Sequence, residues 1–171
     1  MIRYQYKNAK LLFVGINPHY GSFENRIPFS NNKLFWYLLL RAGLIEESMK
    51  DLRNITALKK IYETKFNRVY RLGLVNIINR PTRDITELKK GEENKGVLKI
   101  RRIISSQKPN VVCFIGKVSY EKYTGLKNFT FGWQNDIRGI KTYVMHAPLR
   151  GEADVRVEEL KLVAGVADLL H

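Results

Sequence analysis

Short apolar runs alternate with helical patterns along nearly the whole chain, and this alternation is what most constrains the fold. Four runs have the length and apolar character of buried strands: Leu11–Gly15, Leu74–Ile78, Val111–Gly116 and Thr142–His146. Helical periodicity follows them over Lys33–Gly43, from about Lys95 to Ser106, from near Lys117, and from about Val155 to Leu170. Such alternation favours a parallel sheet with helices on both faces. We therefore predict an α/β fold: a three-layer α/β/α structure with a central, mostly parallel sheet of four or five strands.

The remaining segments complete this prediction. Glu46–Arg71 is charged and is predicted to be helical, whereas Thr82–Lys95 is polar and is predicted to be a loop. The pattern of the last helix predicts a core-facing set of Val155, Leu160, Val163, Val166, Ala167 and Leu170. We see no internal repeat, low-complexity tract or linker, so residues 1–171 are predicted to form one domain.

The charge of the chain limits its partners. There are 30 Lys and Arg against 16 Asp and Glu, for a net charge of +14. This excess favours a polyanionic partner, of which nucleic acid is the commonest and an anionic membrane surface the competitor. The chain lacks an 18-residue apolar run and an apolar signal-peptide core, so we expect a cytoplasmic protein that is not inserted in a membrane. We also expect it to be a monomer.

Cysteine and histidine are too few for a multi-cysteine metal centre. The single cysteine, Cys113, lies within an apolar run and is predicted to be a small core residue. One cysteine and three histidines exclude a multi-cysteine zinc or iron–sulfur site. We expect neither a metal nor an organic cofactor.

Polar residues stand at the ends of the predicted strands. Asn17 follows Leu11–Gly15 and precedes Pro18, which stops the strand. Asn76 lies within the second run, the pair Gly116-Lys117 ends the third, and His146 ends the fourth. In open α/β sheets ligands bind at the carboxyl ends of the strands. These residues are therefore candidates for one site.

Each candidate also has a structural interpretation. Asn17 is suited to hydrogen bonds within its own turn, and Asn76 to the role of a core amide bonded to backbone. Gly116 suits an ordinary strand-to-helix turn, or an anion held at the helix start. His146 suits a satisfied polar residue, or a catalytic one because a loop with Pro148, Arg150 and Gly151 follows it.

A long loop, His19–Asn32, separates the first strand from the first helix and contains Tyr20, Phe23 and Phe29. Long loops in α/β units are often functional. Its aromatic rings are predicted either to stack on a flat base or to anchor the loop to the core.

Several short motifs occur in a fixed order. Gly15-Ile16-Asn17-Pro18 comes first, followed by Pro28-Phe29, Phe35-Trp36 and Ala42-Gly43. Arg80-Pro81-Thr82 ends the second strand region, and Ile115-Gly116-Lys117 with Tyr120 follows the third. Together, over about residues 11–165, they resemble the uracil-DNA glycosylase superfamily, and within it the mismatch-specific thymine/uracil branch.

Two positions depart from that branch. His19 stands where the branch has glycine, and His146-Ala147-Pro148-Leu149-Arg150 is similar to the histidine-type second motif of other branches. The chain thus resembles a hybrid of two branches, which leaves its substrate range open.

The resemblance implies a monofunctional DNA glycosylase that flips uracil, or thymine opposite guanine, out of damaged double-stranded DNA and hydrolyses its bond to deoxyribose. It implies the following roles: Asn17 holds the attacking water and His146 donates to a base oxygen; Gly15, Ile16, Phe29 and Asn76 bind the base; Gly116, Lys117 and Arg150 contact DNA, with Arg150 as a candidate wedge. Neither a metal nor a cofactor is required.

Three other functions stay open at this point. Related branches accept hypoxanthine, so a glycosylase for deaminated purines is one. A non-catalytic nucleic-acid-binding module of the same fold is another, and an α/β protein that serves a different polyanion is the third. The sequence does not rank the lesions, distinguish single- from double-strand preference, or assign a role to His19.

Overall fold

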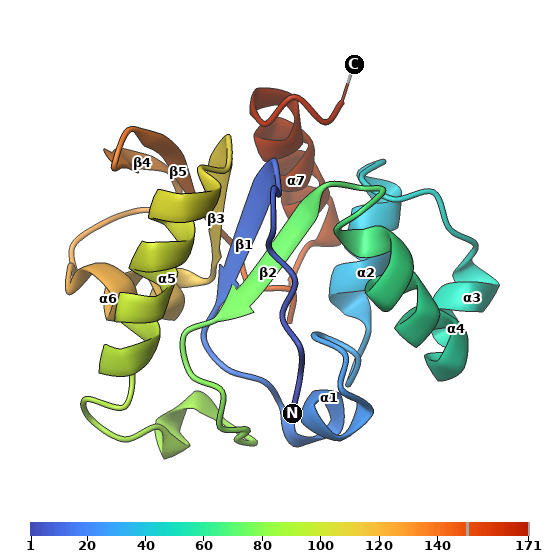
Figure 1. Cartoon of the computed structure of the whole chain (residues 1–171), viewed down its shortest axis with the longest axis horizontal. Helices are drawn as coiled ribbons and strands as arrows, with labels where there is room; N and C mark the ends of the chain where they lie inside the picture. Colours follow the sequence, from blue (N-terminus) through green and yellow to red (C-terminus); the bar gives the residue numbers. More distant parts are fainter. Residues whose placement is uncertain (150, 171) are drawn as a thin grey trace.

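The computed structural model describes residues 1–149 and 151–170, and within them it contains one sheet of five strands (Figure 1). Their order across the sheet is β2-β1-β3-β5-β4. Four strands run parallel: β1 (Leu11–Gly15), β2 (Leu72–Asn76), β3 (Val111–Ile115) and β5 (Ile140–Met145). The edge strand β4 (Gly132–Ile137) is antiparallel to β5. The predicted three-layer α/β fold with a mostly parallel sheet is confirmed.

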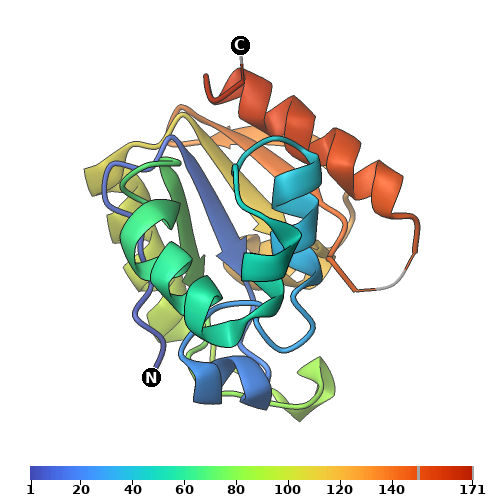
Figure 2. The same cartoon turned by 90° about the vertical axis from the view of Figure 1, so that its right-hand side faces the viewer.

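Successive residues of β1 face two separate cores, as the alternation of side chains along a strand requires. Leu11 and Phe13 pack against α2 (Leu34–Arg41) and α7 (Ala153–Val166). Leu12 and Val14 pack against α5 (Asn94–Gln107) and α6 (Lys117–Thr124). Figure 2 shows α2 and α7 side by side on their face of the sheet. Helices therefore cover both faces of the sheet.

Two strand predictions need correction. The second strand begins at Leu72 and ends at Asn76, two residues earlier than predicted, so Asn76 is the last residue of β2 and not its middle. The edge strand β4 was not predicted. Its residues are mostly polar and partly exposed, because β4 lies at the edge of the sheet and pairs with β5 alone. The two strands are joined by a turn in which Arg138 and Gly139 have positive φ.

The segment between α2 and β2 is helical, as predicted. It forms α3 (Met49–Arg53), α4 (Ile55–Ile61) and the π-helical turn η1 (Tyr62–Phe66). Rings of Trp36, Tyr62 and Phe66 pack edge-on or tilted within 5.5–6.2 Å of one another. Short elements also occur in both long loops: α1 (Tyr20–Asn25) and the 3₁₀ turn η2 (Ile85–Glu87).

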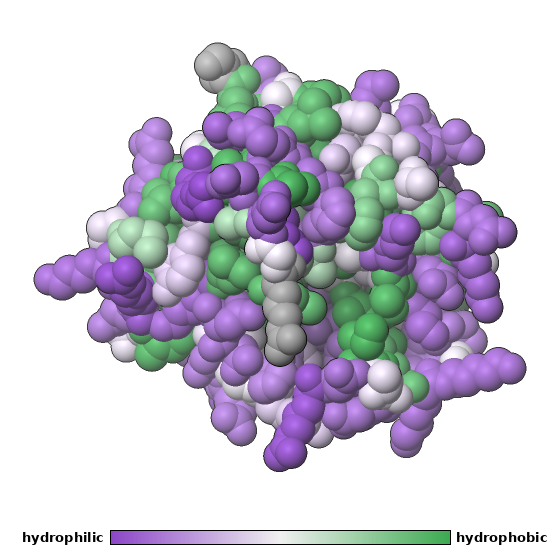
Figure 3. Space-filling model, turned by 180° about the vertical axis from the view of Figure 1, so that it is seen from behind, coloured by the Kyte–Doolittle hydropathy of each residue, from purple (hydrophilic) through white to green (hydrophobic). Residues whose placement is uncertain are grey.

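The inward face of α7 differs from the prediction. Leu160, Val163 and Ala167 are buried, but Val155 and Val166 are 41% and 42% exposed, so the prediction for those two is wrong. Arg156 and Glu159 are buried in their place. The helix is turned so that two charged side chains reach partners near the sheet edge. Figure 3, seen from behind Figure 1, shows apolar patches among hydrophilic side chains on this side of the molecule.

Within residues 1–149 and 151–170, we find no helix long and apolar enough to cross a membrane. Arg150, for which the resemblance implied a DNA contact, lies outside the described residues, as does His171.

Candidate active site

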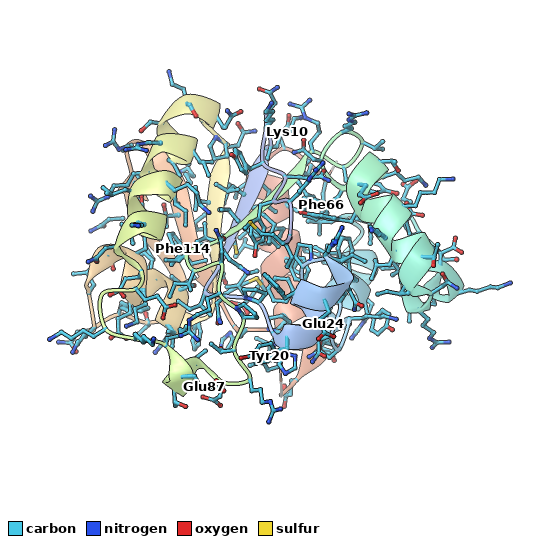
Figure 4. The ribbon with its side chains drawn as sticks, turned by 60° about the horizontal axis from the view of Figure 1, so that its bottom comes forward. Lys10, Tyr20, Glu24, Phe66, Glu87 and Phe114 are labelled. Carbon is cyan, nitrogen blue, oxygen red and sulfur yellow. The ribbon has the colours of Figure 1, made fainter. Side chains whose placement is uncertain are left out.

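A pocket of about 350 Å³ lies at the carboxyl edge of the sheet. Figure 4 brings this edge forward: Tyr20 of α1 and Glu87 of η2 lie near it, whereas Lys10, which precedes β1, lies at the opposite end. Four residues predicted for the site line the pocket: Gly15, Ile16, Asn17 and Phe29. Its other walls come from the loop around Thr82 and from the segment after β5, including Ala147 and Leu149. The predicted first motif therefore does border a cavity.

The Asn17 side chain is held through its nitrogen. Its Nδ2 donates to the Arg80 carbonyl oxygen at 3.0 Å and to the Thr82 hydroxyl at 2.8 Å. Because the amide nitrogen is engaged there, the amide oxygen is the group that can accept a hydrogen bond from a water in the pocket. The Asn17 amide is thus held by two hydrogen bonds from its nitrogen, and Thr82 is an anchor that the sequence did not single out.

Arg80 secures this arrangement from behind. Its guanidinium makes a two-point ion pair with Glu92, Nε to Oε1 at 2.6 Å and Nη2 to Oε2 at 2.9 Å. The hydrogen bonds from Arg80, followed by that from the Lys89 backbone, lower the pKa of Glu92 to about 2. The loop that carries the anchor of Asn17 is therefore itself fixed by a charged pair.

Phe29 adopts a backbone conformation that is unusual for a bulky residue. Its φ is 54°, in the left-handed region, and its ring lies 4.6 Å from that of Phe35. Non-glycine residues held in this region cost about 1–3 kcal/mol and cluster at functional sites. The strain places the ring in the wall of the pocket.

Asn76 does not line the pocket but lies behind Gly15, which does. The side chain is 4% exposed, and its Nδ2 donates to the Tyr4 hydroxyl at 3.0 Å. Within the described part of the chain its Oδ1 is buried and has no hydrogen-bond partner. A Cβ on Gly15 would collide with that oxygen, so Gly15 is what lets the amide approach the floor of the pocket. An orphaned buried acceptor costs about 1–3 kcal/mol, which makes it a candidate contact for a bound molecule.

His146 lies beside the pocket, in an adjoining open hollow of about 550 Å³. Ala147 and Leu149 line both spaces, so the two are neighbours. The His146 ring stacks on Phe131 with centroids 3.6 Å apart and an interplanar angle of 22°. The structure therefore brings Asn17 and His146 to the same edge of the sheet, but each to its own cavity.

Below His146 lies a buried carboxylate that the sequence analysis missed. Oε1 of Glu159 is 2.9 Å from His146 Nδ1 and accepts from the His146 backbone N–H at 3.1 Å. Its Oε2 accepts from the Tyr143 hydroxyl at 3.1 Å. Burial and the neighbouring carboxylate raise the pKa of Tyr143. The available signal in the sequence was a carboxylate on the inward face of α7, three residues after Arg156 and four before Val163.

Two of the predicted DNA contacts, Gly116 and Lys117, lie beside Ala147 and Phe131, which line the hollow of His146. Gly116, with φ at 83°, uses its backbone N–H to bond the Met145 carbonyl oxygen at 2.9 Å, so that N–H serves the fold. Lys117 is exposed, and its Nζ lies 4.8 Å from the centre of the Phe131 ring. Leu149 is 69% exposed, an apolar side chain on the rim of both cavities that the sequence analysis did not single out.

A sequence model of the uracil DNA glycosylase superfamily matches residues 2–159. The chain belongs to this superfamily. The match covers the first motif, all five strands and α7 as far as Glu159, so it includes both strand ends described above.

Membership of the uracil DNA glycosylase superfamily supports a DNA glycosylase, a hydrolase of N-glycosidic bonds that binds DNA and takes part in base-excision repair. The superfamily match is common to all branches. The branch and the lesion therefore belong to the proposal that follows.

Proposed function

We propose that the protein removes uracil from DNA by hydrolysis, with thymine opposite guanine as a second candidate base. The observation that carries the proposal is the pair of polar side chains at the ends of β1 and β5. Asn17 and His146 are each held by partners within the fold, and they border adjoining cavities at the sheet edge.

The target base leaves the helical stack and enters the pocket. Extrusion costs a few kcal/mol and is least costly for mismatched pairs. Phe29 stacks on the extruded base, and stacking of this kind contributes about 1–3 kcal/mol per base. The unpartnered Oδ1 of Asn76 supports a role in reading the polar edge of the base, with access through a shift of the Phe29 wall.

As the glycosidic bond breaks, negative charge develops on the base and positive charge on the sugar. His146 donates a hydrogen bond to a base oxygen and so stabilises the leaving anion. The oxygen of Asn17 holds the water that attacks the sugar carbon. An amide is a weak base, so Asn17 orients the water more than it deprotonates it.

Contacts with the DNA backbone come from the basic surface. Lys117, at the rim, is suited to a phosphate, which makes binding sensitive to salt. Gly116 lets the β3–α6 turn lie close to Ala147. Arg150 remains a candidate wedge for the space left by the flipped base. Leu149 is a second candidate because it is apolar and exposed at the rim, and apolar wedges open base steps.

A panel of oligonucleotides tests the proposal. Each duplex and single strand carries one uracil, one thymine opposite guanine, or one hypoxanthine, and alkali reveals abasic sites after incubation with protein in EDTA. We expect abasic sites at uracil. Release of hypoxanthine alone would assign the protein to deaminated purines. Tight binding of uracil-containing DNA without any abasic site would show a non-catalytic module. The Asn17→Ala variant, purified identically, controls for contaminating glycosylase.

A further inference from the structure

We propose that Glu159 is the positioning residue for His146: it turns Nδ1 inward and presents Nε2 to the cavity. This inference deepens the proposed function and rests on it for its catalytic meaning. Its structural part concerns one imidazole ring and can be tested without DNA.

The first step in the argument is the hydrogen-bond inventory of Glu159. The side chain is 8% exposed and comes from α7, on the inward face of the helix. Its two oxygens face the His146 backbone N–H, His146 Nδ1 and the Tyr143 hydroxyl at 2.9–3.1 Å. A buried charge without such partners costs several kcal/mol, so a carboxylate at this position needs all three donors.

The second step is the consequence for the ring. A carboxylate only accepts hydrogen bonds, so the proton between Glu159 and His146 belongs to Nδ1. Phe131 stacks on the ring with centroids 3.6 Å apart and opposes a ring flip, which would put Cδ2 in the place of Nδ1. A neutral His146 therefore has its proton inside and a lone pair at Nε2.

The third step concerns the reaction. Nε2 donates to a base oxygen only when the ring carries both protons, that is, as the imidazolium. Among the described residues, the other titratable or charged groups that face this site are Cys113 from β3, Tyr143 from β5, Arg156 from α7 and Lys117 from α6, the last across the Phe131 ring. We therefore expect the rate of base release to depend on the side chain that holds Nδ1.

Three variants separate charge, hydrogen bonding and mere bulk. Glu159→Gln keeps an oxygen for the His146 backbone N–H and Nδ1 but has no charge, and the Tyr143 hydroxyl can accept from its amide nitrogen. Glu159→Ala removes both functions. Glu158→Gln is the matched control, because Glu158 is the neighbouring glutamate on α7 and its side chain is 74% exposed.

The direct readout is nitrogen-15 NMR of the imidazole in the protein alone, with His146 assigned by the loss of its signals in His146→Gln. We expect the neutral ring to carry its proton on Nδ1 in the wild type, in Glu158→Gln and in Glu159→Gln, but not in Glu159→Ala. A wild-type ring protonated on Nε2 would overturn the inference. So would an unchanged Nδ1 proton in Glu159→Ala.

The catalytic readout is the single-turnover rate of base release. We expect Glu159→Ala to be slower by about 10²-fold, in the range for loss of a positioned donor. Glu159→Gln should retain more of the wild-type rate than Glu159→Ala does, because its side-chain oxygen still accepts a hydrogen bond from Nδ1. Equal rates for the wild type and both Glu159 variants would contradict the positioning role. If the wild type released no base, the proposed function would fail, but the NMR result would still decide how the His146 ring is placed. If Glu159→Ala did not fold, the spectra of the wild type and of Glu159→Gln would decide how the ring is placed.

Discussion

The helices α5 and α7 have the same length, 14 residues, and lie on opposite faces of the sheet, yet they bury different kinds of side chain. The inward face of α5 consists of Gly96, Val97, Ile100, Ile103 and Ile104. The inward face of α7 includes Arg156 and Glu159 among its apolar residues. The first is a packing helix, and the second also holds functional groups.

The two buried charged residues of α7 each hold part of the segment that follows β5. Arg156 donates from Nε to the Ala147 carbonyl oxygen at 2.6 Å and from Nη1 to the Glu152 carbonyl oxygen at 3.0 Å. Glu159 holds His146, the residue before Ala147, through a contact with its ring nitrogen Nδ1. The difference is that the buried charged residues of α7 hold the segment after β5, whereas the buried residues of α5 only pack. Changes in α5 should therefore alter stability, and changes in the charged residues of α7 should alter activity.

The largest expected effect on stability is at Ile100, which is fully buried in α5. Ile100→Ala should lower the free energy of unfolding by about 2–5 kcal/mol, because it deletes core contacts and leaves a cavity. Denaturant titration measures the loss. Base release per folded molecule should stay at the wild-type value. A selective loss of rate in the folded fraction would break the distinction between the two helices.

A pair of glycines gives a sharper test. A Cβ on Gly96 would overlap the Ile77 carbonyl oxygen, whereas a Cβ on Gly165 of α7 would meet nothing within 4 Å. Gly96→Ala should therefore destabilise the protein by about 1–3 kcal/mol through overpacking. Gly165→Ala should stabilise it by about 0.5–1 kcal/mol through the higher helix propensity of alanine. Thermal unfolding of both variants checks this, and equal shifts of the same sign would contradict the close approach of α5 to Ile77, the residue after β2.

Substitution of Arg156 should lower the rate of base release in the folded protein, which substitution of Ile100 should not. Arg156→Ala removes hydrogen bonds from a charged donor, which cost about 1.5–3 kcal/mol, and frees the carbonyl oxygen of Ala147. We expect the folded variant to release base about tenfold more slowly, because the loop that follows His146 is no longer held. Single-turnover kinetics on the folded fraction measure the rate. An unchanged rate would mean that Arg156 stabilises α7 alone.

The smallest effect concerns the loop that anchors Asn17. The pKa of Glu92 is lowered to about 2 in the folded protein, from an ordinary 4.5. The stability that this pair supplies is therefore present above about pH 4.5 and is lost as the pH falls toward 2. The difference in melting temperature between the wild type and Glu92→Gln should shrink over that interval. A constant difference across it would show that Arg80 and Glu92 are not coupled.

The sequence predicts best what depends on regular apolar patterns. The bounds of β1 agree residue for residue, and α2, α5 and α6 begin within a residue or two of prediction. The strand β4 was missed because an edge strand needs no continuous apolar run. Val155 and Val166 were placed in the core because periodicity assigns apolar residues inward, and it has no means of favouring Arg156 and Glu159.

The site is predictable in part for a similar reason. Asn17 and His146 stand out because each is a polar residue at the end of an apolar run, and parallel strands bring their ends together. Glu159 does not stand out, because it is 13 residues from His146 along the chain and meets it only through the packing of α7 on β5. The placement of Asn76 behind Gly15 and Phe29 likewise depends on the shape of a loop, which periodicity does not determine.

The central claim is that the two strand ends act on one flipped base, and His146→Ala tests it most directly. The single-turnover rate of uracil release and the affinity for uracil-containing duplex are measured for the wild type, His146→Ala and Asn17→Ala at one salt concentration. We predict that each variant loses about 10²–10³-fold in rate, equivalent to about 2.7–4 kcal/mol, while its affinity stays close to that of the wild type. A wild-type rate in His146→Ala would contradict the account and make His146 a structural residue.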